Sequence, residues 1–217
     1  MTRMSPIIKI CGLRTAESLA AALDAGADMV GFVFFGPSPR NISLSEAAAL
    51  APLVKGRARK VALTVDADDA LIDAVARALQ PDILQLHGRE TPARAAQLAA
   101  RTGKKIMKAI GVSERADLAA VADYSAVCDW LLLDAKPPKD ATRPGGNGES
   151  FDWAIIDGFA PGKPWLLSGG LTPANVAEAL ARTGAPGVDV SSGVESAPGV
   201  KDVGAIRGFV AAARALS

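Results

Sequence analysis

The stretch that decides the fold class runs from Ile7 to Leu13 and reads Ile-Ile-Lys-Ile-Cys-Gly-Leu. Because side chains alternate along a β-strand, Lys9 and Cys11 share one face, and two isoleucines share the other. A short strand that is apolar on one face, polar on the other and ends at a glycine is typical of a barrel whose active site lies at the ends of its strands. We expect strands that end in polar residues to recur along the chain.

Short apolar runs alternate with alanine-rich helical patterns throughout the sequence. Eight runs are predicted to be strands: Ile7–Cys11, Met29–Phe34, Lys60–Val65, Ile83–Leu86, Lys105–Ala109, Trp130–Asp134, Trp165–Ser168 and Gly187–Val190. Eight helices are predicted to follow them: Ala16–Ala25, Ser45–Leu53, Asp69–Leu79, Pro92–Ala100, Glu114–Ala122, Phe151–Asp157, Pro173–Arg182 and Val203–Leu216. Dividing 217 residues by eight gives units of about 27 residues.

The simplest closed arrangement of eight such units is a single (β/α)8 barrel over residues 1–217. Each unit is long enough for a parallel crossover, which needs a dozen or more residues. An open, doubly wound sheet is the alternative fold. It is disfavoured because Cys-Gly-Leu-Arg, and not the G-x-G-x-x-G fingerprint of nucleotide-binding sheets, follows the first predicted strand. No linker or change of composition divides the chain.

The composition and the N-terminal sequence favour a cytoplasmic protein. With 24 basic and 23 acidic side chains, the formal net charge of +1 gives no electrostatic reason to expect a nucleic acid or a membrane as partner. No apolar run reaches the roughly 18 residues of a membrane span, and no signal peptide precedes the first strand. The two cysteines form no disulfide or zinc pattern. We expect a monomer or a homodimer.

Two residues at strand ends are candidates for proton transfer. Asp134 follows four apolar residues and precedes a long loop, so partial desolvation at the rim is expected to raise its pKa, which suits a general acid. A helix cap or an ion pair with Lys136 is the alternative role. Cys11 is a candidate nucleophile or general base if Lys9 favours its thiolate, and an inert buried cysteine is the alternative. Cys128 is predicted to be inert.

Three glycine-rich segments predict a phosphate site. Gly145-Gly146-Asn147-Gly148 follows the sixth predicted strand, while Ser168-Gly169-Gly170 and Ser191-Ser192-Gly193 end the seventh and eighth. Loops after the last two strands of such barrels often bind phosphate through backbone N–H groups. One glycine pair is commonly only a turn, but three near adjacent strand ends favour a ligand. The expected phosphate-binding residues are Gly146, Asn147, Gly148, Gly169, Gly170, Ser191, Ser192 and Gly193.

Three more polar residues fall near strand ends. Arg40 follows the second strand, where its planar fork suits a ligand carboxylate, and a solvated loop arginine is the alternative. His87, the only histidine, is a candidate base or orienting donor, or else a rim residue without a chemical role. Asp189 falls late in the eighth strand. Because no second histidine or cluster of carboxylates offers a metal site, we expect chemistry without a metal or other cofactor.

Taken in order, these motifs resemble those of the phosphoribosylanthranilate isomerase family, (β/α)8 enzymes of tryptophan biosynthesis. One such tetrapeptide would be weak evidence, but the ordered set spans nearly the whole chain and is specific. Its members are Lys9-Ile10-Cys11-Gly12-Leu13, Gly31-Phe32-Val33-Phe34, Ser38-Pro39-Arg40, Gln85-Leu86-His87-Gly88, Leu131-Leu132-Leu133-Asp134, Gly145-Gly146-Asn147-Gly148, Phe151-Asp152-Trp153, Ser168-Gly169-Gly170-Leu171 and Gly187-Val188-Asp189-Val190-Ser191-Ser192-Gly193-Val194-Glu195.

The resemblance implies an Amadori rearrangement of N-(5-phosphoribosyl)anthranilate to 1-(2-carboxyphenylamino)-1-deoxyribulose 5-phosphate. It implies that Asp134 is the general acid, which protonates the ribose ring oxygen and opens the ring to a Schiff base. Cys11 is then the general base that takes the proton from ribose C2, and the resulting enolamine tautomerises to the ketone. By the same resemblance, Arg40 holds the anthranilate carboxylate and the glycine loops hold the phosphate. His87 and Asp189 line the site.

Two positions depart from the usual pattern of the family. Asn147 replaces the threonine of Gly-Gly-Thr-Gly, and Ser168 stands where alanine is common. Neither removes a backbone N–H donor, so the departures affect side-chain contacts to the phosphate. The segment 135–150 is longer than a typical connection and is predicted to be a mobile cover.

Two other functions compete with this interpretation. The related isomerase of histidine biosynthesis uses the same kind of barrel without a metal, but it relies on paired aspartates, so a cysteine at the end of the first strand would be out of place. A non-catalytic phosphosugar-binding barrel would tolerate the loss of Cys11 or Asp134, and both are present. The fold alone does not choose among the three functions.

Overall fold

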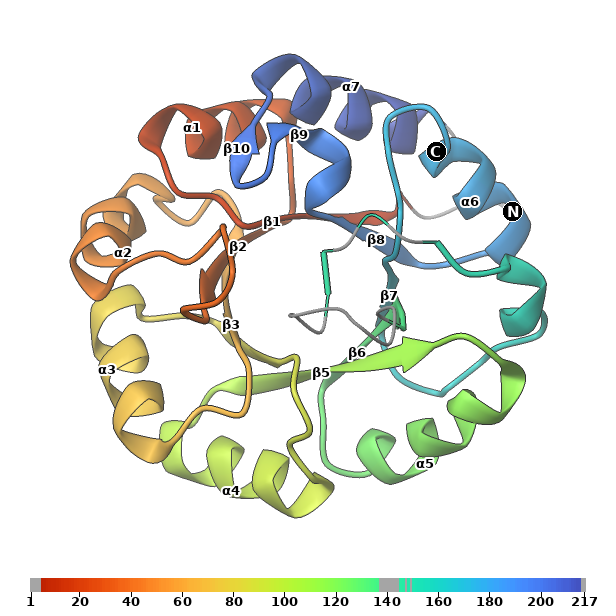
Figure 1. Ribbon diagram of the computed structural model, residues 1–217, viewed down its shortest axis with the longest axis horizontal. Helices are drawn as coiled ribbons and strands as arrows, with labels where there is room; N and C mark the ends of the chain where they lie inside the picture. The colour runs from red at the N-terminus through yellow and green to blue at the C-terminus, as the bar shows by residue number, and fades with distance from the viewer. Residues whose placement is uncertain (1–4, 137–144, 147, 149, 216–217) are drawn as a thin grey trace.

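A closed barrel of eight parallel strands forms the centre of the computed structural model, which describes residues 5–136, 145, 146, 148 and 150–215. The strands are β1 (Ile7–Cys11), β2 (Met29–Phe34), β3 (Arg59–Thr64), β4 (Ile83–Leu86), β5 (Lys105–Val112), β6 (Trp130–Ala135), β7 (Trp165–Leu167) and β8 (Gly187–Val190). Each strand pairs with the next, and β8 closes the ring on β1 (Figure 1). The predicted (β/α)8 fold is confirmed.

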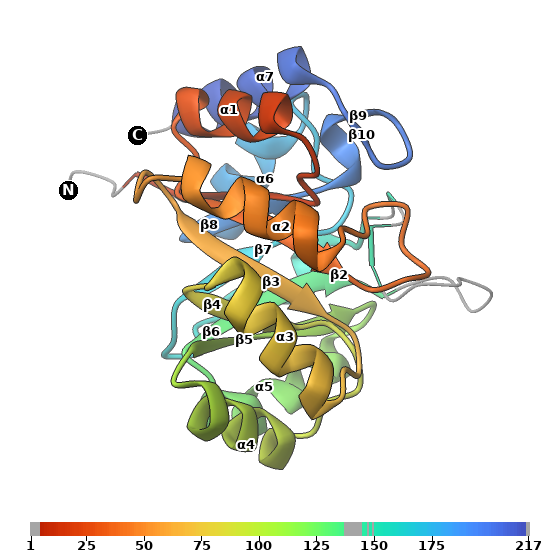
Figure 2. The same cartoon turned by 90° about the vertical axis from the view of Figure 1, so that its left-hand side faces the viewer.

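Helices surround the barrel as an outer layer (Figure 1). The described α-helices are α1 (Ala16–Ala25), α2 (Leu44–Leu50), α3 (Asp69–Leu79), α4 (Pro92–Thr102), α5 (Ala120–Ser125), α6 (Val176–Thr183) and α7 (Val203–Arg214). Four short 3-10 helices accompany them: η1 (Ala51–Leu53), η2 (Arg115–Ala119), η3 (Trp153–Ile156) and η4 (Ser192–Val194). Figure 2 shows α1 to α4 stacked one after another along one side of the barrel.

Local capping signals explain where many of these helices begin. The side chains of Thr15, Asp68, Thr91 and Asp202 each accept a hydrogen bond from a backbone N–H in the first turn that follows. Ser43 forms a reciprocal capping box with the third residue of α2. Such bonds satisfy N–H groups that have no partner inside the helix, so they fix the helix start.

The helix predicted over Phe151–Asp157 is largely wrong. Only Trp153–Ile156 is helical, as the 3-10 helix η3, because Asp157 already adopts an extended ψ of 126°. A loop with Gly158 and Pro161-Gly162 follows, and such residues end helices. The helix predicted over Glu114–Ala122 is partly wrong as well, since it starts as η2 and becomes α-helical only in α5.

Buried side chains fill two layers, one inside the barrel and one between the barrel and the helices. Ile8 and Ile10 belong to the outer layer, so Lys9 and Cys11 point into the barrel, as the alternation along β1 predicts. The floor of the interior is apolar and consists of Met29, Val61, Ile83, Met107, Ala109, Trp130, Leu132 and Leu166. Cys11 instead packs with Val33 and Leu63 near the carboxyl ends of the strands.

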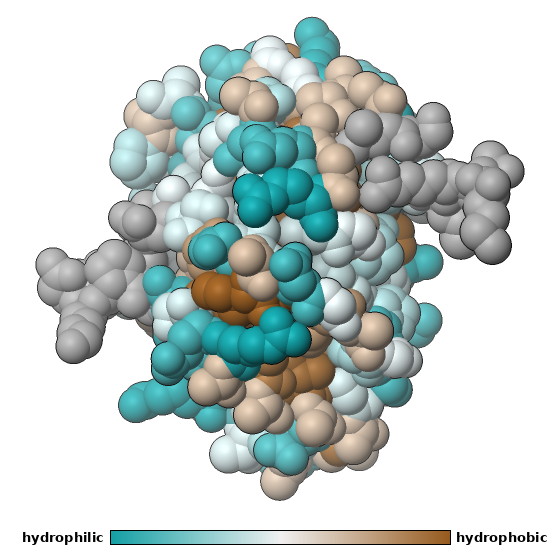
Figure 3. All heavy atoms as spheres, turned by 90° about the vertical axis from the view of Figure 1, so that its right-hand side faces the viewer, coloured by the Kyte–Doolittle hydropathy of each residue, from teal (hydrophilic) through white to brown (hydrophobic). Residues whose placement is uncertain are grey.

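The outer surface carries a mixture of hydrophilic and hydrophobic side chains. On the face shown in Figure 3, a small hydrophobic area is bordered by hydrophilic residues. Within the described ranges, no helix is both long and apolar enough to span a membrane.

Between β8 and α7 the chain forms a small hairpin that stands outside the barrel. Its strands are β9 (Glu195–Ala197) and β10 (Val200–Lys201), which pair antiparallel. The turn between them contains Pro198 and Gly199, and Gly199 has a left-handed φ of 80°. The hairpin places Glu195 and Lys201 side by side at the barrel mouth.

Candidate active site

A cavity of about 770 Å³, including its open mouth, lies at the carboxyl ends of the strands. Twelve of the thirteen predicted site residues line it: Cys11, Arg40, His87, Asp134, Gly146, Gly148, Gly169, Gly170, Asp189, Ser191, Ser192 and Gly193. Asn147 lies outside the described residues, as does most of the segment predicted to be a mobile cover. The strand order therefore brings residues far apart in sequence to one cavity.

A buried ion pair lies beneath this cavity. Lys9 is fully buried, and its Nζ lies 2.6 Å from Oδ1 of Asp189. The two residues are register partners across the β1–β8 pair that closes the barrel. Burial alone lowers the pKa of Lys9, but the Asp189 carboxylate and Cys11 outweigh it and raise the pKa above its ordinary value. Ser168 donates to the other Asp189 oxygen at 3.4 Å.

Cys11 ends β1 and is 3% exposed, so its thiol is largely desolvated. Burial raises the pKa of this thiol, and the nearby carboxylate of Asp189 adds to the rise. The charges of Lys9 and Lys201 act in the opposite direction but do not outweigh burial. Burial therefore works against the expected thiolate character, although Cys11 lines the cavity.

The second cysteine has a different environment. Cys128 is 2% exposed and belongs to the apolar layer between barrel and helices. Burial raises the pKa of its thiol to about 11. Because Cys128 does not line the cavity, it serves as a matched control for Cys11.

Asp134 ends its strand across the barrel mouth from β1 and contacts His87. Its Oδ2 lies 3.3 Å from Nε2 of His87, while its Oδ1 accepts from the Ala135 N–H at 3.0 Å. The alternative ion pair with Lys136 does not form, because Lys136 pairs with Asp117. The carboxyl group is nearly buried and faces the cavity.

His87 is oriented from its other side by Gln85. The Gln85 Nε2 lies 3.0 Å from His87 Nδ1. With the amide in this orientation Nδ1 accepts, so the proton of a neutral imidazole sits on Nε2 and points to Asp134. The Gln85 Oε1 has no hydrogen-bond partner among the described residues. The two contacts from Gln85 to His87 and from His87 to Asp134 thus fix the Asp134 carboxyl group from one side.

Gly145 covers the contact between His87 and Asp134. A Cβ atom at this position would lie 2.8 Å from Asp134 Oδ2 and closer still to His87 Nε2. No side chain fits there without displacing one of the two groups. Sequence reasoning assigned Gly145 only to the glycine-rich loop.

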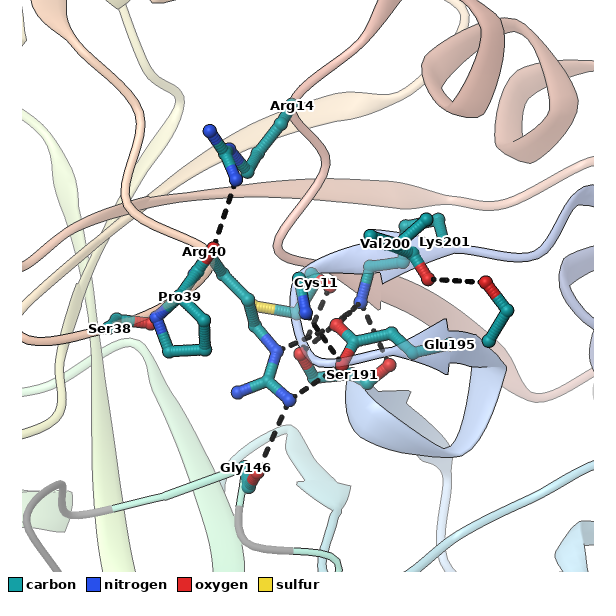
Figure 4. A network of polar contacts seen from close by, with 12 residues as sticks. Cys11, Arg14, Ser38, Pro39, Arg40, Gly146, Ser191, Glu195, Val200 and Lys201 are labelled. Carbon is teal, nitrogen blue, oxygen red and sulfur yellow. Dashed lines mark hydrogen bonds and ion pairs between the residues drawn. The ribbon is translucent and has the colours of Figure 1, made fainter.

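A cluster of charged side chains surrounds Arg40, which also lines the cavity (Figure 4). Its Nε and Nη2 donate to the two carboxylate oxygens of Glu195 at 2.7 and 2.8 Å. Lys201 Nζ lies 2.8 Å from the same carboxylate, and Arg40 Nη2 also donates to the Gly146 carbonyl at 3.2 Å. Burial raises the pKa of Glu195, but the two cations outweigh it and leave the pKa below its usual value.

The glycine-rich loops after β7 and β8 lie against each other. A Cβ atom on Gly193 would clash with the carbonyl oxygen of Leu171, so this approach requires glycine. The structure gives no hydrogen bond from the backbone N–H groups of Gly169, Gly170, Ser192 or Gly193 to another described residue. These donors lie along the cavity wall, where an anion would satisfy them.

Sequence reasoning missed Glu195 and Lys201 as parts of the site. Glu195 was noted only as the last residue of a motif, and Lys201 was not singled out. The signal available was the Pro-Gly turn between them, which favours a hairpin and hence places the two residues next to each other.

Comparisons with known proteins show which family the chain is similar to. The family model described as N-(5'phosphoribosyl)anthranilate (PRA) isomerase matches residues 8–212. An N-(5'-phosphoribosyl)anthranilate isomerase from Bradyrhizobium sp. strain BTAi1 is 59% identical over 212 residues, covering 98% of this chain and 97% of the relative. The crystal structure of phosphoribosyl anthranilate isomerase from Thermotoga maritima is 35% identical with a TM-score of 0.87, covering 97% and 99% of the two chains. A phosphoribosyl anthranilate isomerase in complex with reduced 1-(o-carboxyphenylamino)-1-deoxyribulose 5-phosphate is 33% identical with a TM-score of 0.84 and the same coverage.

Proposed function

The chain belongs to the N-(5'-phosphoribosyl)anthranilate isomerase family, and we propose that Asp134 and Cys11 carry its isomerisation as general acid and general base. The reaction is the Amadori rearrangement of N-(5-phosphoribosyl)anthranilate in tryptophan biosynthesis. The observation that carries the residue assignment is the placement of one carboxyl and one thiol in a single cavity, on β6 and β1. Two groups on separate strands reach different atoms of one bound sugar.

Asp134 supplies the first proton. In its protonated form it donates to the ribose ring oxygen, so that the C1–O bond breaks and the aniline nitrogen becomes part of a Schiff base. The contact with His87 at 3.3 Å fixes the direction of the carboxyl group during this step. His87 is therefore an orienting residue in this proposal.

Cys11 removes the second proton. As a thiolate it takes the proton from ribose C2, and the electron pair moves into the C1–C2 bond to give the enolamine. Tautomerisation to the ketone then completes the rearrangement. Lys9 and Lys201 support this step, because both charges favour the thiolate over the thiol.

The cavity lining offers groups suited to both anions of the substrate. Arg40 faces the cavity with a guanidinium group suited to the anthranilate carboxylate. The backbone N–H groups after β7 and β8 suit the phosphate. A related isomerase binds a product analogue that carries both anions, which supports a phosphorylated, carboxylate-bearing substrate here.

Turnover of freshly generated N-(5-phosphoribosyl)anthranilate, followed by loss of its fluorescence with chelator present, tests the proposal. We expect conversion by the wild type and loss in Asp134→Asn, because an amide keeps the shape but supplies no proton. Cys11→Ser should be severely impaired, since a hydroxyl offers almost no anionic base at neutral pH. The same substitution at Cys128 is the matched control and should retain turnover.

Three outcomes would contradict parts of this assignment. Normal turnover by Asp134→Asn would contradict the assignment of Asp134 as general acid. Normal turnover by Cys11→Ser would show that Cys11 only packs in the core. No conversion by the wild type, together with tight binding of a phosphorylated product analogue, would favour the non-catalytic phosphosugar-binding barrel. The monomeric or homodimeric state stays a prediction, which light scattering tests.

A further inference from the structure

Arg40 is held in place before any ligand binds. Its Nε and Nη2 form one edge of the guanidinium group, and both oxygens of Glu195 occupy that edge. The remaining nitrogen, Nη1, donates no hydrogen bond within the described part of the chain. In Figure 4 it points away from Glu195. The edge formed by Nη1 and Nη2 therefore faces the cavity, where it packs against the Gly146 backbone, whose carbonyl accepts from Nη2.

Glu195 is itself fixed by the hairpin that carries it. Its carboxylate accepts from both Arg40 nitrogens, from Lys201 Nζ at 2.8 Å and from the Gly199 N–H at 3.2 Å. Lys201 in turn donates to the Ser191 carbonyl at 2.8 Å, which ties the hairpin to the end of β8. The carboxylate thus has almost no freedom to follow a moving arginine.

The charges in this cluster do not balance. Two cations, Arg40 and Lys201, surround one carboxylate, and the three side chains are at most 5% exposed. One positive charge therefore remains uncompensated among them. Buried charge is costly unless it is paired, so the cluster favours an anion at the cavity-facing edge of Arg40 that Glu195 leaves unpaired.

We propose that Glu195 is the positioning residue that makes the site selective for a substrate with a carboxylate on its aromatic ring. It acts by aiming the free edge of Arg40 into the cavity, and Lys201 keeps the cluster positive. The inference rests on the proposed function, because it requires that Arg40 contacts the substrate carboxylate. Without Glu195, the guanidinium group keeps only the hydrogen bond from Nη2 to the Gly146 carbonyl, which does not fix its orientation.

The test compares two inhibitors that differ by one group. One is reduced 1-(2-carboxyphenylamino)-1-deoxyribulose 5-phosphate, and the other is the same compound with a phenyl ring that lacks the carboxylate. In Glu195→Gln we expect the carboxylated inhibitor to bind about tenfold or more weakly, as for loss of a hydrogen bond to a charged group. The inhibition constant of the phenyl compound should change less than about twofold. A purely structural role would weaken both inhibitors equally, which would overturn the proposal.

Two further variants separate position from charge and from stability. Glu195→Asp keeps the charge but is one methylene too short to reach the fork at 2.7 to 2.8 Å, so it should show the same selective loss. Full selectivity in Glu195→Asp would contradict a positioning role. Asp28→Asn is the matched control: Asp28 pairs with Arg214 at 2.7 Å and does not line the cavity. Inhibition constants are measured on the folded enzyme, so partial unfolding of a variant does not alter them.

The wild-type result distinguishes failure of the inference from failure of the proposed function. If the wild type binds both inhibitors equally, Arg40 does not contact the carboxylate, and the proposed binding mode is wrong. If the wild type prefers the carboxylated inhibitor and Glu195→Gln keeps that preference in full, only the role of Glu195 is wrong.

Discussion

Replacing Lys9 with methionine tests the pair at the centre of the barrel. Methionine has a similar length and keeps the apolar stem packed, but it removes the ammonium group 2.6 Å from Asp189. The carboxylate is then left nearly buried without its cation, since Asp189 is only 5% exposed. Breaking a buried pair in this way typically costs about 3–5 kcal/mol. At about 2–4 °C per kcal/mol for a chain of this length, Tm should fall by about 6–20 °C.

A double variant shows whether the loss comes from the orphaned carboxylate. In Lys9→Met/Asp189→Asn neither partner is charged, so at least half of the lost stability should return. Turnover should not return, because the lysine charge that favours the Cys11 thiolate is still missing. Thermal unfolding followed by circular dichroism gives Tm, and the fluorescence assay gives turnover. If the two substitutions destabilise additively, or Lys9→Met changes Tm by less than about 3 °C, the pair is not coupled as argued.

The titration of Cys11 and the close packing of Gly145 against Asp134 and His87 give three more predictions. Burial raises the pKa of Cys11, so only a small fraction of the thiol is deprotonated at neutral pH. The rate of its alkylation by iodoacetamide should therefore rise about tenfold per pH unit, with no plateau below a pH of about 8.5. In Lys201→Met the midpoint of this titration, read at Cys11 by mass spectrometry, should move further upward; a downward shift would contradict the charge argument. Gly145→Ala should lower turnover about 100-fold, because the new Cβ displaces Asp134 or His87, whereas Gly36→Ala, where a Cβ meets nothing, should leave turnover unchanged.

Strand positions were predictable because the alternation of apolar and polar side chains, and the glycine residues that end the strands, are local signals in the sequence. The run from Ile7 to Cys11 carries its apolar and polar faces in five residues, and the structure places its ends at the same residues. The helix expected over Phe151–Asp157 failed because seven residues are too few for periodicity to tell a helix from a single 3-10 turn. The length of this helix, and the residue at which it ends, depend on the path of the loop that connects it to β7.

The members of the site were predictable, but their contacts were not. A barrel gathers strand ends at one mouth, so Cys11 and Asp134 share a cavity once the strand count is known. The pairing of Arg40 with Glu195 joins residues 155 positions apart, and no local pattern encodes it. The pKa of Cys11 likewise depends on a balance between burial and several charges, which needs positions in space.

The burial of Cys11 favours the thiol form of the proposed base over the thiolate. Even an unperturbed cysteine costs about 2 kcal/mol to deprotonate at pH 7, and the burial of Cys11 adds to that cost. Lys9 and Lys201 oppose it, but Lys9 pairs with Asp189 and Lys201 shares Glu195 with Arg40, so their field at sulfur is weaker than that of two unpaired ammonium groups. In the proposed mechanism, deprotonation of Cys11 is therefore part of the barrier to removing the C2 proton. We therefore expect the free enzyme to resist alkylation and oxidation at Cys11, because the thiolate is the reactive form.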